Sequence, residues 1–169
     1  SLEGEKCVIL GAGGAAKAAV VLAAEKNAAE IYIINRTVEK AENIAESVRK
    51  FYNGKIYAAG YDFLMKIPSP KYVINTTSAG MGDGVWKSVV EDINFFKGVK
   101  AVVDIVYVPW ETKILHDAAK MGCAAVNGFN MLIYQGIASY EIWHDTKIEN
   151  EKAKEIRNIL ADYYTGAKK

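Results

Sequence analysis

Residues 8–16 read Val8-Ile9-Leu10-Gly11-Ala12-Gly13-Gly14-Ala15-Ala16, an apolar run followed by a glycine-rich turn and an alanine-rich stretch. The spacing G-x-G-x-x-A is the small-residue form of a dinucleotide-binding fingerprint. Gly11 permits a tight turn, Gly13 lets the backbone approach a pyrophosphate, and Ala16 lets a helix pack closely on a strand. The amino end of that helix would present free N–H groups to the phosphates. The alternative is an ordinary turn between a strand and a helix.

Short apolar runs recur along the rest of the chain, and they are continuous rather than alternating, as in strands that are covered on both faces. Helical spacing of apolar residues separates several of them. This alternation predicts an α/β fold, a Rossmann-like doubly wound parallel sheet of about six strands with helices on both faces, followed by C-terminal helices. The predicted strands are residues 7–10, 31–34, 55–58, 72–74, 101–103 and 124–126. The predicted helices are residues 15–26, 38–52, 112–121, 131–143 and 149–164.

Composition excludes several classes of protein. The 169 residues predict one domain, at about 150 residues per domain. A formal net charge of +1 offers no bulk field for nucleic acid or an anionic membrane. No apolar run approaches the roughly 20 residues of a membrane span, and no signal peptide is evident, so a cytoplasmic protein is expected. Two cysteines are too few for a disulfide scaffold, and His116 and His144 share no metal-ligand spacing with each other or with the cysteines.

Polar residues follow the second predicted strand, in Ile33-Ile34-Asn35-Arg36-Thr37. An NAD site places Asp or Glu about 20 residues past the glycines, on the ribose 2′-hydroxyl. This sequence instead has Arg36, with Thr37 and Lys40 close behind, and these suit the 2′-phosphate of NADP. The alternative is that Arg36 is a solvated charge and that Thr37 only caps the next helix.

Three more segments follow the last three predicted strands. In Asn75–Met81, a cluster of hydroxyls could bond the nicotinamide ribose, or form an ordinary polar turn. In Asp104–Thr112, Tyr107 offers a phenol near the expected crevice, because ligands of open α/β sheets bind at the carboxyl ends of strands. Asp104 could be catalytic, although an aspartate at a strand end more often accepts hydrogen bonds in a turn or cap.

The segment Asn127–Gln135 follows the sixth strand. Gly128 allows a close approach of the backbone. Gln135 has an amide that can recognise substrate hydroxyls, although it is equally compatible with an ordinary position on a helix surface.

In this order, the segments resemble the C-terminal NADP-binding half of the shikimate dehydrogenase family. The resemblance covers about residues 5–145. The glycine turn is shared by many dehydrogenases, whereas the segments after the fourth, fifth and sixth strands are together much more specific. The matching stretches are Gly11–Ala15, Asn35–Thr37, Asn75–Met81, Asp104–Thr112, Gly128–Gln135 and the closing Tyr140–Trp143.

The resemblance implies that NADPH reduces 3-dehydroshikimate to shikimate, in the biosynthesis of aromatic amino acids. The implied contacts include Ile105 against the nicotinamide, the backbone of Gly128 at the carboxamide, and Tyr107 and Gln135 on the substrate. No catalytic residue and no metal ligand is expected in this chain. The full implied set for the cofactor is Gly11, Ala12, Gly13, Gly14, Ala15, Asn35, Arg36, Thr37, Lys40, Thr77, Ser78, Ile105 and Gly128.

The family also carries a substrate-binding domain before the nucleotide domain, with the groups for proton transfer, and only Ser1–Gly4 precede the first predicted strand here. The expected organisation is therefore an NADP-binding domain at 1–145 and a C-terminal helix and tail at 146–169, without the substrate domain. An apolar face on the last helix would then dimerise, pack against the sheet or stay exposed. It comprises Ile156, Ile159, Leu160 and Tyr163.

Two other functions remain open at this point. The chain could be a non-catalytic NADP-binding or interaction module, which would need no groups for proton transfer. It could also come from another two-domain NADP enzyme, such as a quinate-type or methylene-folate dehydrogenase. The last motifs favour the shikimate group, but shikimate and quinate are not separable from the sequence.

Overall fold

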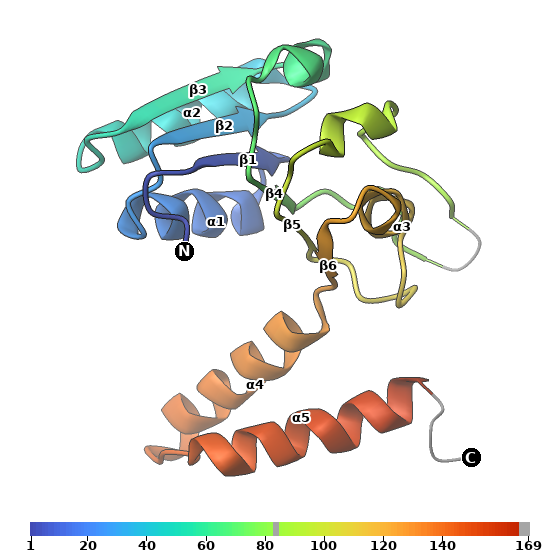
Figure 1. The fold of residues 1–169 in the computed structure, drawn as a ribbon. Coiled ribbons are helices and arrows are strands. Elements are labelled where there is room, and N and C mark those ends of the chain that lie inside the picture. Colours follow the sequence, from blue (N-terminus) through green and yellow to red (C-terminus); the bar gives the residue numbers. More distant parts are fainter. Residues whose placement is uncertain (83–84, 166–169) are drawn as a thin grey trace.

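The computed structural model describes residues 1–82 and 85–165, which form a six-stranded parallel sheet in the order β3-β2-β1-β4-β5-β6 (Figure 1). This is the doubly wound order, in which the chain reverses its direction of travel between β1 and β4. All six predicted strands are confirmed to within one residue at either end. They are β1 (Lys6–Leu10), β2 (Glu30–Ile34), β3 (Lys55–Ala59), β4 (Tyr72–Asn75), β5 (Ala101–Asp104) and β6 (Ala124–Val126).

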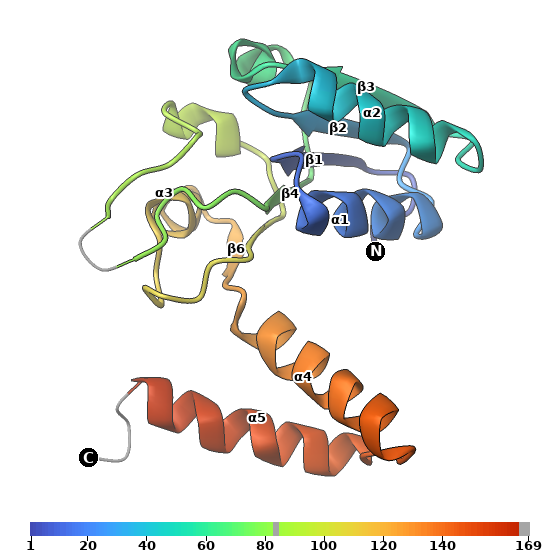
Figure 2. The ribbon, with the colours of Figure 1, turned by 180° about the vertical axis from the view of Figure 1, so that it is seen from behind.

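Helices cover both faces of the sheet, as predicted (Figures 1 and 2). On one face, α1 (Gly14–Glu25) and α2 (Val38–Arg49) pack on residues such as Ile9 of β1. On the other, α3 (Lys113–Lys120) and two 3₁₀ helices complete a second core around residues such as Val8. The 3₁₀ helices, η1 (Tyr61–Lys66) and η2 (Ile93–Phe96), were not predicted, because elements this short carry no helical period.

The expectation that every strand is covered on both faces holds for β1 and fails for β6. Residues 7–10 of β1 are fully buried, and burial raises the pKa of the Cys7 thiol to about 12. In β6 all three residues are exposed. The reason is position: β6 is the edge of the sheet, and the chain leaves it as a helix that projects away (Figure 1).

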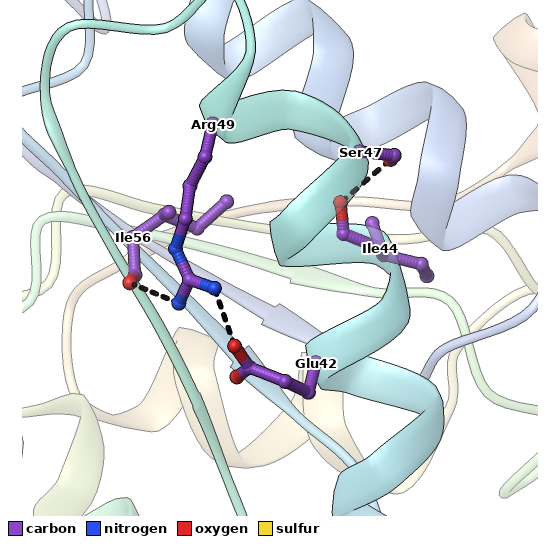
Figure 3. A network of polar contacts seen from close by, with 5 residues as sticks. All are labelled: Glu42, Ile44, Ser47, Arg49 and Ile56. Atoms are coloured by element: carbon purple, nitrogen blue, oxygen red, sulfur yellow. Dashed lines mark hydrogen bonds and ion pairs between the residues drawn. The ribbon is translucent and has the colours of Figure 1, made fainter.

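Hydrogen bonds from side chains fasten α2 to β3 across their connection. The guanidinium of Arg49 reaches the Glu42 carboxylate on its own helix and donates to the backbone oxygen of Ile56 in β3 at 3.3 Å (Figure 3). The Tyr52 hydroxyl donates to the backbone oxygen of Ala28 at 2.6 Å. The Arg49 bond ties α2 to β3, and the Tyr52 bond ties the connection between them to the chain just before β2.

The last two helices, α4 (Phe129–His144) and α5 (Asn150–Thr165), form an antiparallel pair beyond β6 (Figures 1 and 2). The predicted boundary at residues 145–146 falls in the loop between them. The apolar face expected on the last helix is divided: Ile156 and Leu160 are partly buried facing α4, whereas Ile159 and Tyr163 remain exposed. In the described residues, no helix is long and apolar enough to cross a membrane.

Candidate functional site

The carboxyl ends of β1, β2, β4 and β5 meet at one edge of the sheet, where two adjacent hollows bring most of the predicted site residues together. The glycine-turn hollow, of about 570 Å³, is lined by residues that include Gly11, Ala12, Gly13, Asn35, Arg36, Thr37 and Lys40. The Tyr107 hollow, of about 390 Å³, is lined by residues that include Met81, Ile105, Val106 and Tyr107. Both also include Thr76, Thr77 and Ser78, so the two hollows share a wall.

Two glycines of the turn are required for different reasons. Gly11 has a φ of 107°, and a Cβ on it would lie 2.6 Å from the Thr76 hydroxyl oxygen, so the fold itself demands glycine. A Cβ on Gly13 would meet no atom within 4 Å. Nothing in the described protein therefore fills the space beside Gly13, as the approach of a ligand would require.

The amino end of α1 lies directly behind this turn. Gly13 is its N-cap, no side chain caps it, and its first turn carries no acidic residue. The N–H groups and the positive end of the helix dipole are therefore free to bind an anion. Ala12 and Gly13 line the hollow, while Gly14 and Ala15 belong to the first turn of α1. Ala16 is fully buried, as close packing of helix on strand requires.

Two exposed cations stand on the rim of the glycine-turn hollow. Arg36 follows β2, and Lys40 lies in the first turn of α2. Within residues 1–82 and 85–165 neither forms an ion pair. Thr37 is the N-cap of α2, yet its hydroxyl makes no capping hydrogen bond. This rim can therefore offer a guanidinium, an ammonium and a hydroxyl to an anionic group such as a phosphate.

Asn35 shapes the turn that carries these groups. Its side-chain amide donates to the backbone oxygen of Thr37 at 2.8 Å, and its backbone N–H donates to the backbone oxygen of Ala59 at 3.0 Å. The turn is therefore held by the side chain of Asn35 and by a backbone hydrogen bond to the end of β3.

The glycine-turn hollow includes two polar residues that the sequence analysis missed, Tyr61 and Lys87. Tyr61 opens η1, directly after β3; burial raises the pKa of its phenol, while the positive charge of Arg36 acts in the opposite direction. Its place after a strand of the same sheet was a usable signal. Lys87 comes from an irregular segment, and no pattern in the sequence marks it.

Gly128 and Gln135 line neither hollow. The close approach expected at Gly128 is to the protein itself: a Cβ there would lie 1.9 Å from the backbone oxygen of Ile105. Its N–H donates to the backbone oxygen of Val106 at 3.1 Å, so Gly128 supports the back of the Tyr107 hollow. Gln135 is exposed on α4, outside the lining of the Tyr107 hollow.

Asp104 ends β5 and is fully buried. Its carboxylate accepts from the Asn75 amide at 2.9 Å, from the Thr112 hydroxyl at 2.6 Å and from the Val106 N–H at 3.1 Å. Burial raises the pKa of Asp104, and these three hydrogen bonds partly oppose the shift. Asp104 lines neither hollow, so the geometry fits the hydrogen-bond acceptor and not the catalytic acid.

Comparison with known proteins identifies relatives of this chain. Residues 1–79 match the family model described as shikimate / quinate 5-dehydrogenase. A shikimate dehydrogenase (NADP(+)) of Alkaliphilus metalliredigens is 37% identical over 160 residues, which are 92% of this chain and 56% of that protein.

Two crystal structures share the fold. One is a chorismate mutase/shikimate 5-dehydrogenase fusion protein from Clostridium acetobutylicum, 33% identical with a TM-score of 0.84, where the match covers 97% of this chain and 57% of that one. The other is a shikimate dehydrogenase in complex with NADP⁺, 32% identical with a TM-score of 0.79, covering 96% and 55%.

The chain thus spans about half the length of the relatives that it matches. The similarity nevertheless includes nearly all of the chain, from the glycine turn to the final helices, in both sequence and fold. The chain belongs to the shikimate dehydrogenase family and corresponds to its C-terminal portion.

Proposed function

We propose that this chain binds NADP(H) and is the cofactor-binding half of a shikimate dehydrogenase, which transfers hydride between NADPH and 3-dehydroshikimate to give shikimate. The observation that carries the proposal is the glycine-turn hollow, where an uncapped helix end and two cations without ion-pair partners in the described chain share a wall with the Tyr107 hollow. The NADP⁺ complex of the structural relative supports the same cofactor.

In this proposal the adenosine and pyrophosphate lie in the glycine-turn hollow, and the nicotinamide lies in the Tyr107 hollow. Gly11, Ala12, Gly13, Gly14 and Ala15, with the amino end of α1, would hold the pyrophosphate, and Asn35, Arg36, Thr37 and Lys40 the 2′-phosphate. Thr77, Ser78 and Ile105 would lie along the nicotinamide end, with Gly128 behind Ile105. When bound, the cofactor supplies the hydride, and the chain supplies binding and orientation.

The substrate site would be completed by a second body. Tyr107, in the lining of the Tyr107 hollow, would be one substrate contact. Gln135 on α4 would be the other. Large apolar side chains exposed on α4 and α5 favour a macromolecular partner there. We assign this surface to the substrate-binding domain of the family, with a second copy of this chain as the alternative.

In this organisation residues 1–145 form the NADP-binding domain and residues 146–169 the C-terminal helix and tail, and α5 extends the docking surface. A cytoplasmic location belongs to the same proposal. It is supported by Cys7 and Cys123, which are both buried free thiols.

The test is titration of the chain with NADPH and with NADH by calorimetry, before and after Arg36→Ala. Hydrogen bonds to charged groups contribute about 1.5–3 kcal/mol, so the substitution should weaken NADPH binding by roughly 10- to 100-fold and NADH binding by much less. Lys26→Ala is the matched control, since it removes a cation at the other end of α1. Absence of NADPH binding by the unmodified chain, or equal losses for both coenzymes, contradicts the proposal.

One observation favours a second candidate, a non-catalytic NADP-binding module. Tyr107 is the only ionisable side chain among the described residues that line the Tyr107 hollow. Addition of the substrate-binding domain from a family member separates the candidates, because only the enzyme half gains shikimate-dependent reduction of NADP⁺. The same assay with quinate in place of shikimate distinguishes the two substrates.

A further inference from the structure

A buried polar network lies behind the wall that the two hollows share. Its centre is the Asp104 carboxylate at the end of β5, opposite Asn75 at the end of β4, which is its register partner. Both residues are at most 1% exposed, and neither lines a hollow. The two side chains at the centre of the network are therefore hidden from any ligand in the hollows.

The network ties together segments that are distant in sequence. From Asp104, hydrogen bonds run to the Val106 N–H, next to Tyr107, and to the hydroxyl of Thr112, where α3 begins. Through Asn75 it reaches Thr77, whose N–H and hydroxyl both donate to the Asn75 amide oxygen, at 3.2 and 2.7 Å. One carboxylate thus links the loop after β4, the loop after β5 and the start of α3.

Stability alone is a poor reason for this arrangement. Burial of a carboxylate without a cation is costly, and in the described residues no cation forms an ion pair with Asp104. Apolar side chains at strand ends would fill the same space at lower cost. A fully satisfied buried network instead gives one fixed geometry, and here it fixes the loops that form the walls of the Tyr107 hollow.

We propose that Asp104 and Asn75 are positioning residues, which act through Thr77 and Val106 to hold the nicotinamide end of the dinucleotide in place without touching it. The inference rests on the proposed binding of NADP(H). The adenosine end depends on different groups, the glycine turn and the Arg36 rim, and neither is hydrogen-bonded to Asp104 or Asn75. Loss of the network should therefore weaken binding of the whole dinucleotide more than binding of its adenosine part alone.

The experiment compares NADP⁺ with 2′,5′-ADP, which contains the adenosine and the 2′-phosphate but no nicotinamide. Thr112→Val removes the donor to Asp104 with little change of shape, and Asn75→Ala breaks the link to Thr77. Each should raise the dissociation constant of NADP⁺ by roughly tenfold, the scale of a hydrogen bond to a charged group, while that of 2′,5′-ADP changes little. Thr112→Ser retains the hydroxyl and should restore NADP⁺ binding.

Asp117→Asn is the matched control, because it removes the other buried carboxylate of this region, which pairs with Lys113 on α3 and lines neither hollow. It should leave the ratio of the two dissociation constants unchanged. Unchanged NADP⁺ affinity in both network variants overturns the inference, and so does a parallel loss of both ligands or a failure to fold, since each marks a purely structural role. If the unmodified chain binds neither ligand, the proposed function itself has failed.

Discussion

At the scale of single residues, the two glycines of the turn separate the needs of the fold from the needs of the ligand. Gly11→Ala places a Cβ 2.6 Å from the Thr76 hydroxyl at a positive φ, which should cost on the order of 1–3 kcal/mol of folding free energy and also disrupt the hollow. Gly13→Ala meets open space, so the unfolding midpoint should stay nearly unchanged while NADPH affinity falls. Urea unfolding and calorimetry of both variants check this. Equal destabilisation by both substitutions would be the contrary result.

Asp104 predicts a particular dependence of stability on pH. Because burial raises the pKa of its carboxyl, the folded protein binds more protons than the unfolded chain between the ordinary pKa of aspartate and the raised value. The contribution of Asp104 to the free energy of unfolding should thus fall as pH rises through that window and then level off. Urea unfolding of the wild type and of Asp104→Asn at a series of pH values isolates it. A free energy of unfolding of the wild type that rises with pH relative to that of Asp104→Asn would contradict the prediction.

At the scale of elements, the connection from α2 to β3 depends on one buried hydroxyl. Tyr52→Phe removes the hydrogen bond to the backbone oxygen of Ala28, and loss of one partner of a buried pair costs about 1–3 kcal/mol. Tyr57→Phe, at a position 39% exposed in β3, should cost much less. Urea unfolding measures both substitutions. Similar costs for the two would mean that the Tyr52 bond does not anchor this connection.

The elements also show what the sequence can and cannot predict. Apolar runs and helical spacing specify the strands and the long helices, because burial on both faces leaves a continuous pattern. Lys87 escaped the sequence analysis because it lies in an irregular segment, where contacts come from the tertiary fold, whereas the place of Tyr61 after β3 was a signal left unused. Gln135 shows the reverse limit: a motif gives its position on α4, but not where that helix points relative to the sheet.

At the scale of the whole molecule, the two hollows share a wall at the carboxyl ends of the strands, while α4 and α5 expose several large apolar side chains. Ile142, Trp143 and Tyr163 are about four-fifths exposed, at 79%, 78% and 80%. Exposed apolar groups of this size fit the docking surface that we propose for the substrate-binding domain. In the proposed function, binding of the cofactor and completion of the substrate site therefore fall to different parts of the molecule.

This separation leads to a prediction about activity. The chain alone should bind NADPH yet reduce 3-dehydroshikimate only slowly, since loss of a group for proton transfer typically costs about 10²- to 10⁴-fold. Addition of a family substrate-binding domain should raise the rate, and the double substitution Ile142→Glu with Trp143→Glu should abolish that gain while NADPH affinity stays unchanged. Lys147→Glu, a charge change in the loop between the same helices, is the control. Full activity of the chain alone, or a gain that survives the double substitution, would place the proton-transfer groups or the docking surface elsewhere.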